Sequence, residues 1–266
     1  MNRRTAISTL ALAAAPAIAG PVGLRLPGGF DPRQIAGLKL WLDASKITGL
    51  NDGDSVGTWN DLSGNANDAT QATSNKKPTF QTNEINGLPA VQFDGVDDTM
   101  AIPSITITGY TAFVVGIKDS SSTSKMPLFC SNPGSSGGGF IFLYYSDANL
   151  YSTTFGGGGA PNGTFVYSSG AGINTALSSA FIGVADYESG AAANTIKHYI
   201  NSTLYSLAYT HSAQTFGTGI EEIGARTNSG DYANAKYSEV LLYNSKLSDA
   251  NRSLVESYLR TKWGTP

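Results

Sequence analysis

The feature that most constrains this chain is a long series of short segments with strand-forming composition, separated by turn-forming residues. The segments are rich in Tyr, Phe, Ile and Val, which suit a pleated surface, and clusters of Gly, Asn and Ser separate them. This alternation predicts an all-β sandwich of two antiparallel sheets rather than a βαβ fold. The expected strands include residues 38–42, 89–94, 110–117, 140–146, 150–155, 165–168, 180–186, 196–200, 204–209 and 237–243.

One short helix is expected near the C-terminus. Ser248 is a suitable N-cap, and Asp249 favours the positive end of the helix dipole. Apolar residues between 254 and 259 recur at helical spacing, and Gly264 follows the last turn. We expect Trp263 to pack back onto the sandwich.

Composition limits the classes of partner. A single sandwich domain can fill 266 residues, and the charged fraction of 14% is well below the usual quarter, so the surface is built mainly from small polar residues. The net charge is −3 and no basic run follows Arg4, so no nucleic-acid partner is expected. Cys130 is the only cysteine, which excludes an intrachain disulfide, and its apolar neighbours predict that it is buried.

The N-terminus has the pattern of an export signal. Arg3 and Arg4 precede an alanine-rich apolar run, and Ala17-Ile-Ala19 offers a small-residue cleavage pattern. The paired arginines also resemble a twin-arginine leader, although Thr5 stands where a large apolar residue is expected. An N-terminal arm of a virion protein is the alternative.

These observations predict three parts of the chain. A signal peptide is expected over residues 1–19, a Gly/Pro-rich linker over 20–34 and one domain over 35–266. The apolar run is too short to span a bilayer, so no membrane span is expected. The chain is therefore predicted to be secreted or displayed on a cell surface, with a virion as the alternative location.

Four segments define a pattern by their order and spacing. They are Leu40-Trp-Leu-Asp-Ala-Ser45 with Val56-Gly-Thr-Trp-Asn-Asp-Leu-Ser-Gly-Asn65, the stretch 88–98, Ile196-Lys-His-Tyr-Ile-Asn-Ser202, and Tyr237-Ser-Glu-Val-Leu-Leu-Tyr243 with the following helix. Together they resemble the laminin G-like branch of the concanavalin A-like lectin/glucanase superfamily, over about residues 35–264. The resemblance implies a jelly-roll sandwich that ends in a strand and a short helix. Ser202 replaces the glycine that is usual in the third segment.

The sequence lacks the motifs of the enzymes that we considered. Glucanases that resemble this fold carry Glu-x-Asp-x-x-Glu on one strand, and this chain has no such pattern. Glu221 and Glu222 are adjacent, as are Asp97 and Asp98, so on a strand each pair would point to opposite faces. No Gly-x-Ser-x-Gly elbow is present. We predict that the chain is not an enzyme, and a divergent glycan hydrolase remains the third alternative.

Two acidic loops are candidates for a calcium site, since the resemblance implies calcium at one rim of the sandwich. Calcium prefers six to eight oxygen ligands from carboxylates, amides and backbone carbonyls. Neither loop matches an EF-hand, and turn chemistry explains the same side chains equally well. The candidate ligands are Asp61, Asn65, Asn67 and Asp68 in one loop, and Asp94, Asp97 and Asp98 in the other.

Aromatic residues beside Gly-rich loops are candidates for a sugar-binding face. Tyr144, Tyr145 and Tyr151 lie near the loops 133–139 and 156–159, where glycine lets a ligand approach the backbone closely. The alternative is that such tyrosines belong to the core, and adjacent Tyr144 and Tyr145 should point to opposite faces.

The prediction from sequence is a non-catalytic carbohydrate- or surface-binding module. Its expected partner is a glycan or a cell or virion surface, calcium is a candidate cofactor, and an oligomer is compatible with the sequence. The alternative is a structural or adhesive component of a phage tail or capsid, or of a cell surface.

Overall fold

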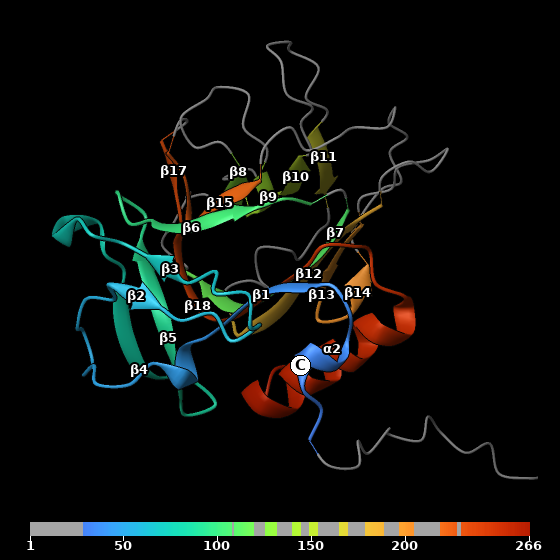
Figure 1. Ribbon diagram of the computed structural model, residues 1–266, viewed down its shortest axis with the longest axis horizontal. Helices are drawn as coiled ribbons and strands as arrows, with labels where there is room; N and C mark the ends of the chain where they lie inside the picture. The colour runs from blue at the N-terminus through green and yellow to red at the C-terminus, as the bar shows by residue number, and fades with distance from the viewer. Residues whose placement is uncertain are drawn as a thin grey trace, which may run out of the picture. The chain divides into compact units, whose positions relative to one another are not determined.

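A computed structural model describes residues 29–107, 109–119, 126–131, 140–144, 149–153, 165–169, 179–188, 197–204, 219–227 and 230–266. The chain divides into residues Met1–Phe30, of which only 29 and 30 are described, and a compact unit, Asp31–Pro266. The compact unit confirms the predicted all-β sandwich of antiparallel sheets with a C-terminal helix (Figure 1).

The first sheet is organised around β18, which pairs with β1, β5 and β7. Its strand order is β14-β13-β12-β7-β18-β5-β4, and β1 also pairs with β18, all antiparallel. Its strands are β1 (Leu38–Asp43), β4 (Thr79–Ile85), β5 (Leu88–Asp94), β7 (Tyr110–Lys118), β12 (Phe181–Tyr187), β13 (Lys197–Ile200), β14 (Thr203–Leu204) and β18 (Asn234–Tyr243).

The second sheet has the order β11-β10-β9-β8-β15-β6-β3-β2, and β16 and β17 form a separate small pair. The strands are β2 (Thr58–Trp59), β3 (Ala69–Thr70), β6 (Met100–Ile105), β8 (Met126–Ser131), β9 (Phe140–Tyr144), β10 (Asn149–Thr153), β11 (Phe165–Ser169), β15 (Ile220–Ile223), β16 (Ala225–Arg226) and β17 (Asp231–Tyr232). Among the described residues, three short 3-10 helices lie at η1 (Pro32–Gln34), η2 (Ala44–Lys46) and η3 (Ser74–Lys76).

The core lies between the two sheets. Val91 and Tyr237 from the first sheet and Met100, Leu128 and Ile223 from the second belong to one buried apolar cluster. Successive strand residues point to opposite faces, so Gln92, which lies between the core residues Val91 and Phe93, faces away from the core. This alternation is what places polar side chains on the outer face of the first sheet.

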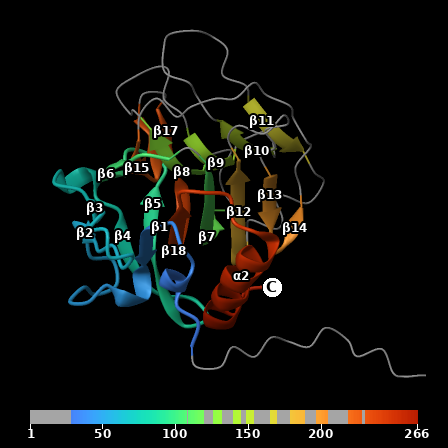
Figure 2. The same cartoon turned by 45° about the vertical axis from the view of Figure 1, so that its right-hand side comes forward.

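Helix α2 (Asp249–Trp263) packs against the first sheet near β12 and β1 (Figures 1 and 2). Ser248 is the N-cap as predicted, since its Oγ accepts a hydrogen bond from the Asn251 amide at 3.2 Å. Gly264 ends the helix in the left-handed conformation, at φ 63°. Trp263 is fully buried against the sandwich, which confirms its predicted packing.

Glu239 of β18 fixes the C-terminal end of α2 to the sheet. This carboxylate is fully buried, and burial raises its pKa while the Lys262 ammonium opposes that shift. Lys262 also contacts Asp43 of β1, so two carboxylates share one ammonium. Glu239 accepts hydrogen bonds from Trp41 Nε1 at 2.7 Å, Tyr258 OH at 2.8 Å, Lys262 Nζ at 2.7 Å and Trp263 Nε1 at 2.6 Å. A buried charge with this many donors is satisfied, and the network serves to hold the helix.

The hairpin between β13 and β14 is formed without the usual glycine. Asn201 and Ser202 both have positive φ, at 50° and 64°, which is the pattern of a type I′ turn. The Ser202 hydroxyl donates to Glu256 Oε2 at 2.6 Å and accepts from Arg260, so α2 stabilises this strained turn. Cys130 is buried as predicted. Among the described residues, no helix is long and apolar enough to cross a membrane.

Candidate functional site

The acidic turn Asp94–Asp98 connects the two sheets at one rim of the sandwich. It follows β5 of the first sheet and precedes β6 of the second. Asp94 Oδ1 accepts hydrogen bonds from the amides of Val96 at 2.8 Å and Asp97 at 3.3 Å, so this side chain shapes the turn. Gly95 takes a φ of 80°, which a side chain would strain.

Three carboxylates of this turn lie together. One oxygen from each of Asp94, Asp97 and Asp98 falls within 4.8 Å of the other two. Asp98 Oδ2 accepts from the Asp94 amide at 3.0 Å, and Asp97 Oδ2 accepts from Asn75 Nδ2 at 3.3 Å. Each carboxylate therefore uses one oxygen to hold the turn and has a second oxygen that could contact a cation.

Burial makes the charge on Asp98 costly. This side chain is only 5% exposed, and burial, followed by the nearby charge of Asp94, raises the pKa of Asp98 to about 6. Behind it, Thr99 Oγ1 donates to Glu222 Oε1 at 2.8 Å, and burial also raises the pKa of Glu222. The turn thus concentrates negative charge against a low-dielectric interior, an arrangement that a bound cation would stabilise.

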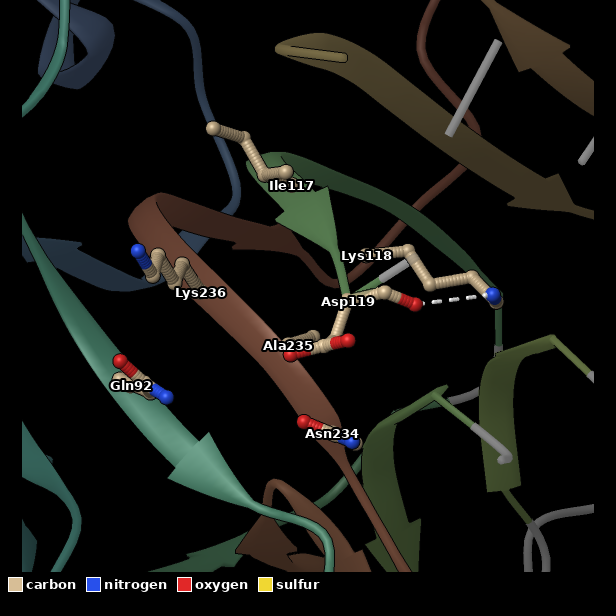
Figure 3. Close-up of a pocket in the computed structure, with 7 residues that line it drawn as sticks. All are labelled: Gln92, Ile117, Lys118, Asp119, Asn234, Ala235 and Lys236. Carbon is tan, nitrogen blue, oxygen red and sulfur yellow. Dashed lines mark hydrogen bonds between the residues drawn. The ribbon is translucent and has the colours of Figure 1, made fainter. Parts of the chain in front are cut away.

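A pocket of about 180 Å³ lies beside the acidic turn, at the ends of β5, β7 and β18 (Figure 3). The register places Gln92 opposite Lys236 and Lys236 opposite Ile117, so these three residues form a row across the strands. Lys118 is almost fully buried; its Nζ donates to the Asp119 carbonyl at 3.1 Å, and burial lowers its pKa. The pocket is lined by Gln92, Ile117, Lys118, Asp119, Asn234, Ala235 and Lys236.

Asn234 lies between the pocket and the acidic turn. Asn234 lines the pocket and is the register partner of Asp94. A Cβ at Gly95 would lie 2.7 Å from Asn234 Cβ, so the turn packs directly against this residue. We refer to the pocket residues together with residues 94–98 as the rim site. Its amide, carboxylate and ammonium groups can donate to and accept from a polyhydroxylated ligand.

The other predicted calcium loop is occupied by its own hydrogen bonds. Asp61 Oδ1 accepts from the amides of Trp41 and Ser63, each at 2.9 Å, and Asp61 Oδ2 accepts from Ser63 Oγ at 2.7 Å and the Asn67 amide at 3.0 Å. The side-chain amides of Asn65 and Asn67 donate to backbone carbonyls of β1 at 3.0 and 2.8 Å. Asp68 Oδ1 accepts from the backbone amide of Asp61 at 2.7 Å. The structure brings these four residues together as a hydrogen-bonded turn.

Two of the three candidate tyrosines, Tyr144 and Tyr151, lie in the other sheet. Tyr144 is on β9 and Tyr151 on β10, where the register pairs Tyr144 with Leu150 and Tyr151 with Leu143. Tyr145 falls outside the described residues. The two strands belong to the second sheet, whereas the strands of the pocket belong to the first.

Sequence reasoning missed the pocket residues. Gln92, Asn234 and Lys236 alternate with core residues along β5 and β18, so their outward direction was readable from the sequence. The pairing of these two distant strands was not readable, and that pairing is what brings the three side chains together.

Comparisons with known proteins show the fold and no family. No family model matches the sequence, and no protein with a curated description matches it. A Trypanosoma rangeli sialidase in complex with 2,3-difluoro-KDN aligns with a TM-score of 0.53 and 16% identity, over 97% of this chain and 37% of that chain. The chain therefore spans little more than a third of that sialidase.

Binding domains of toxins are also similar. The receptor binding domain of botulinum neurotoxin D aligns with a TM-score of 0.57 and 12% identity, over 89% of this chain and 57% of that chain. The binding domain of Paraclostridial Mosquitocidal Protein 1 aligns with a TM-score of 0.55 and 13% identity, over 89% and 56% of the two chains. At these identities the likeness shows the β-sandwich fold alone.

One prediction from sequence requires correction. We predicted that the chain is not an enzyme, and this is wrong as a deduction from the fold, because sialidases are among the structures with a similar fold. The missing glucanase motif excludes one catalytic arrangement only, and a sandwich of this kind also occurs in a chain that carries sialidase activity.

Proposed function

We propose that this chain binds carbohydrate and that the rim site is its binding surface. The observation that carries the proposal is the pocket at the ends of β5, β7 and β18, whose lining residue Asn234 packs against the acidic turn. At the level of the fold, support comes from similar structures, which include a receptor binding domain, a binding domain and a sialidase in complex with sialic acid.

The lining suits a neutral or mixed-charge sugar. Gln92 and Asn234 each offer an amide that can donate and accept, and Asp119 offers acceptors to hydroxyl groups. Lys236 is paired with Glu84 Oε2 at 2.6 Å, so its charge is partly compensated before a ligand arrives. Hydroxyl groups of a bound sugar would replace water at these side chains. Each polar group of the pocket must then form a hydrogen bond with the sugar, or affinity is lost.

We also propose that calcium binds at Asp94, Asp97 and Asp98. Three carboxylates within 4.8 Å repel one another, and a divalent cation would offset that repulsion. Since Gly95 packs on Asn234, a cation that orders the turn would also order one wall of the pocket. Sugar binding is then expected to strengthen in the presence of calcium.

A glycan-array screen of residues 20–266, run with calcium and again with chelator, tests the proposal. We expect binding to a defined class of glycan, and the variant Gln92→Ala should lose it without a change in thermal unfolding. Asp68→Asn serves as the control variant, because Asp68 lies outside the rim site, in the hydrogen-bonded turn at residues 61–68. Binding that survives Gln92→Ala and Asn234→Ala would remove the rim site from the proposal, and no binding under either condition would reject it.

Two further properties complete the proposal. We propose that the chain belongs to the laminin G-like branch. The four sequence segments described above and the β-sandwich that contains them support this. We also propose that residues 1–19 are an export leader and that the rest is secreted or displayed on a surface. N-terminal sequencing of the protein recovered outside a bacterial host would find a start near residue 20, and a start at Met1 would contradict this.

A further inference from the structure

A row of four side chains crosses the outer face of the first sheet and reaches beyond the pocket of the rim site. The register pairs Thr79 of β4 with Gln92 of β5. Gln92 in turn pairs with Lys236 of β18, and Lys236 pairs with Ile117 of β7 (Figure 3). Paired residues point to the same face, and all four are partly exposed. We refer to these four residues as the transverse row.

The pocket covers only one end of the transverse row. Its lining includes Gln92, Lys236 and Ile117 but no residue of β4. Its volume of about 180 Å³ is smaller than the roughly 300 Å³ at which pockets for drug-sized ligands begin, so it admits a single sugar ring. A longer ligand would therefore leave the pocket and continue over the sheet outside it.

The surroundings of Gln92 leave such a ligand one open direction over the sheet. Along β5 in one direction, the next residue on the same face is Ala90, which is fully buried, and η2 packs against this strand. In the other direction β5 ends at Asp94, in the acidic turn. Across the strands, Gln92 is followed by Thr79, which is partly exposed. The open path over the sheet therefore runs across the strands, from β7 to β4.

The transverse row has two defined ends. Thr79 forms a β-bridge with Ser55, so the edge of β4 is already paired there. At the other end, β12 begins at Phe181, opposite Gly116, and no strand among the described residues continues the row beyond Ile117. Neighbouring strands lie about 4.8 Å apart, so the row is about 14 Å long. An extended sugar chain advances by about one strand spacing per unit, so the row fits about three units.

The end of the row on β4 is equipped for hydroxyl groups. Gln81 Nε2 donates to Thr79 Oγ1 at 3.0 Å, which leaves the Gln81 carbonyl oxygen to accept and the Thr79 hydroxyl to donate. Glu84 Oε2 accepts from Lys236 Nζ at 2.6 Å, so these two charges compensate each other and hold both side chains in place. An uncharged ligand matches this surface, and its binding requires little further ordering of these side chains.

We propose that the rim site binds an uncharged, extended, β-1,4-linked oligosaccharide of about three units, which crosses the sheet from β7 to β4. One unit occupies the pocket, and the following units lie over Gln92 and then over Thr79 and Gln81. Strand β4 thus supplies a second subsite, in which Gln81 contacts the unit farthest from the pocket. This inference rests on the proposed binding of carbohydrate at the rim site and adds residues of β4 to it.

A series of ligand lengths tests the proposal without any variant. The full chain is titrated by calorimetry with β-1,4-linked oligomers of glucose, of N-acetylglucosamine and of xylose, each from one to five units long. In at least one series, affinity should rise at least about tenfold from the single sugar to the trimer and then level off, because each subsite adds hydrogen bonds.

The other outcomes separate this inference from the proposed function. Single sugars that bind as tightly as trimers would overturn the subsite on β4 and leave carbohydrate binding at the rim site intact. No binding in any of the three series would overturn the extended β-1,4-linked ligand. A positive glycan array would then retain the proposed function for another class of carbohydrate, and a negative array would reject both.

The variant Gln81→Ala distinguishes the subsite on β4 from the pocket. It should lower affinity for the trimer about tenfold and leave affinity for the single sugar unchanged, because Gln81 lies outside the pocket lining. Gln34→Ala, which changes an exposed glutamine of η1, is the matched control and should bind as the parent chain does. Equal losses for the trimer and the single sugar, or no loss for the trimer, would overturn the role of Gln81.

A trimer of β-1,4-linked mannuronate tests the uncharged class, because each of its units carries a carboxylate. It should bind the parent chain at least about tenfold more weakly than the best uncharged trimer, since Lys236 is already paired with Glu84. Glu84→Gln frees the ammonium of Lys236 and should narrow this difference. Tighter binding of the mannuronate trimer to the parent chain would overturn the uncharged class.

Discussion

The two acidic turns of this molecule contain similar residues and differ in what their oxygens do. In the turn at residues 61–68, both oxygens of Asp61 accept hydrogen bonds from within the protein. In the turn at residues 94–98, each carboxylate uses one oxygen for the turn, and the three lie within 4.8 Å of each other. Carboxylate density alone therefore does not indicate a cation site, and the number of oxygens left over after local hydrogen bonding is the better criterion.

The largest expected effect on stability comes from a variant in the hydrogen-bonded turn at residues 61–68. Asp61→Ala removes the acceptor for four hydrogen bonds, one from Trp41 of β1 and three from Ser63 and Asn67 within the turn, and we expect a loss of about 3 kcal/mol in the free energy of unfolding. Urea unfolding measures this. Asp97→Asn in the other turn should change stability by less than about 0.5 kcal/mol. Equal losses in the two variants would erase the distinction between the turns.

The next effect concerns the backbone of the acidic turn. Gly95→Ala should cost about 2 kcal/mol, because φ is 80° and the new Cβ would meet Asn234. Gly53→Ala is a matched control, since Gly53 has a φ of 82° and open space around it. A smaller loss at Gly53 isolates the contribution of the contact with Asn234, and equal losses would show that this contact is unimportant.

A smaller effect is expected from the buried carboxyl of the same turn. The pKa of Asp98 is raised to about 6 in the folded chain, so folding favours its protonated form. The contribution of the Asp98 carboxyl to the free energy of unfolding is greatest below about pH 4 and falls as the pH rises through 6. In chelator, Asp98→Asn should match the parent at pH 4 and exceed it by about 1 kcal/mol at pH 8. An Asn variant that is less stable than the parent at pH 8 contradicts this.

The smallest effect is the response to calcium. With a dissociation constant of about 1 mM, 2 mM calcium should stabilise the chain by about 0.6 kcal/mol, or about 2 °C in Tm. Asp97→Asn should abolish the shift and Asp68→Asn should retain it. The reverse result would move the cation to the turn at residues 61–68, and no shift in the parent chain would reject both turns.

The sandwich and the C-terminal helix were predictable because their signals are local. Alternating apolar residues such as Val91 and Phe93, and an N-cap such as Ser248, fix strand faces and a helix start within a few residues. The rim site depends instead on the pairing of β5 with β18, which are far apart in the sequence. The sequence alone therefore could not predict that Gln92 and Asn234 lie close together.

The position of β18 determines when the sheet can assemble. This strand pairs with β1, β5 and β7, all of which precede it by a long interval in the sequence, and only α2 follows it among the described elements. During synthesis those three strands emerge first and have no common neighbour until β18 leaves the ribosome. Folding of the first sheet therefore awaits the synthesis of residues 234–243, and a premature stop before residue 234 would release a product that lacks the strand joining β1, β5 and β7.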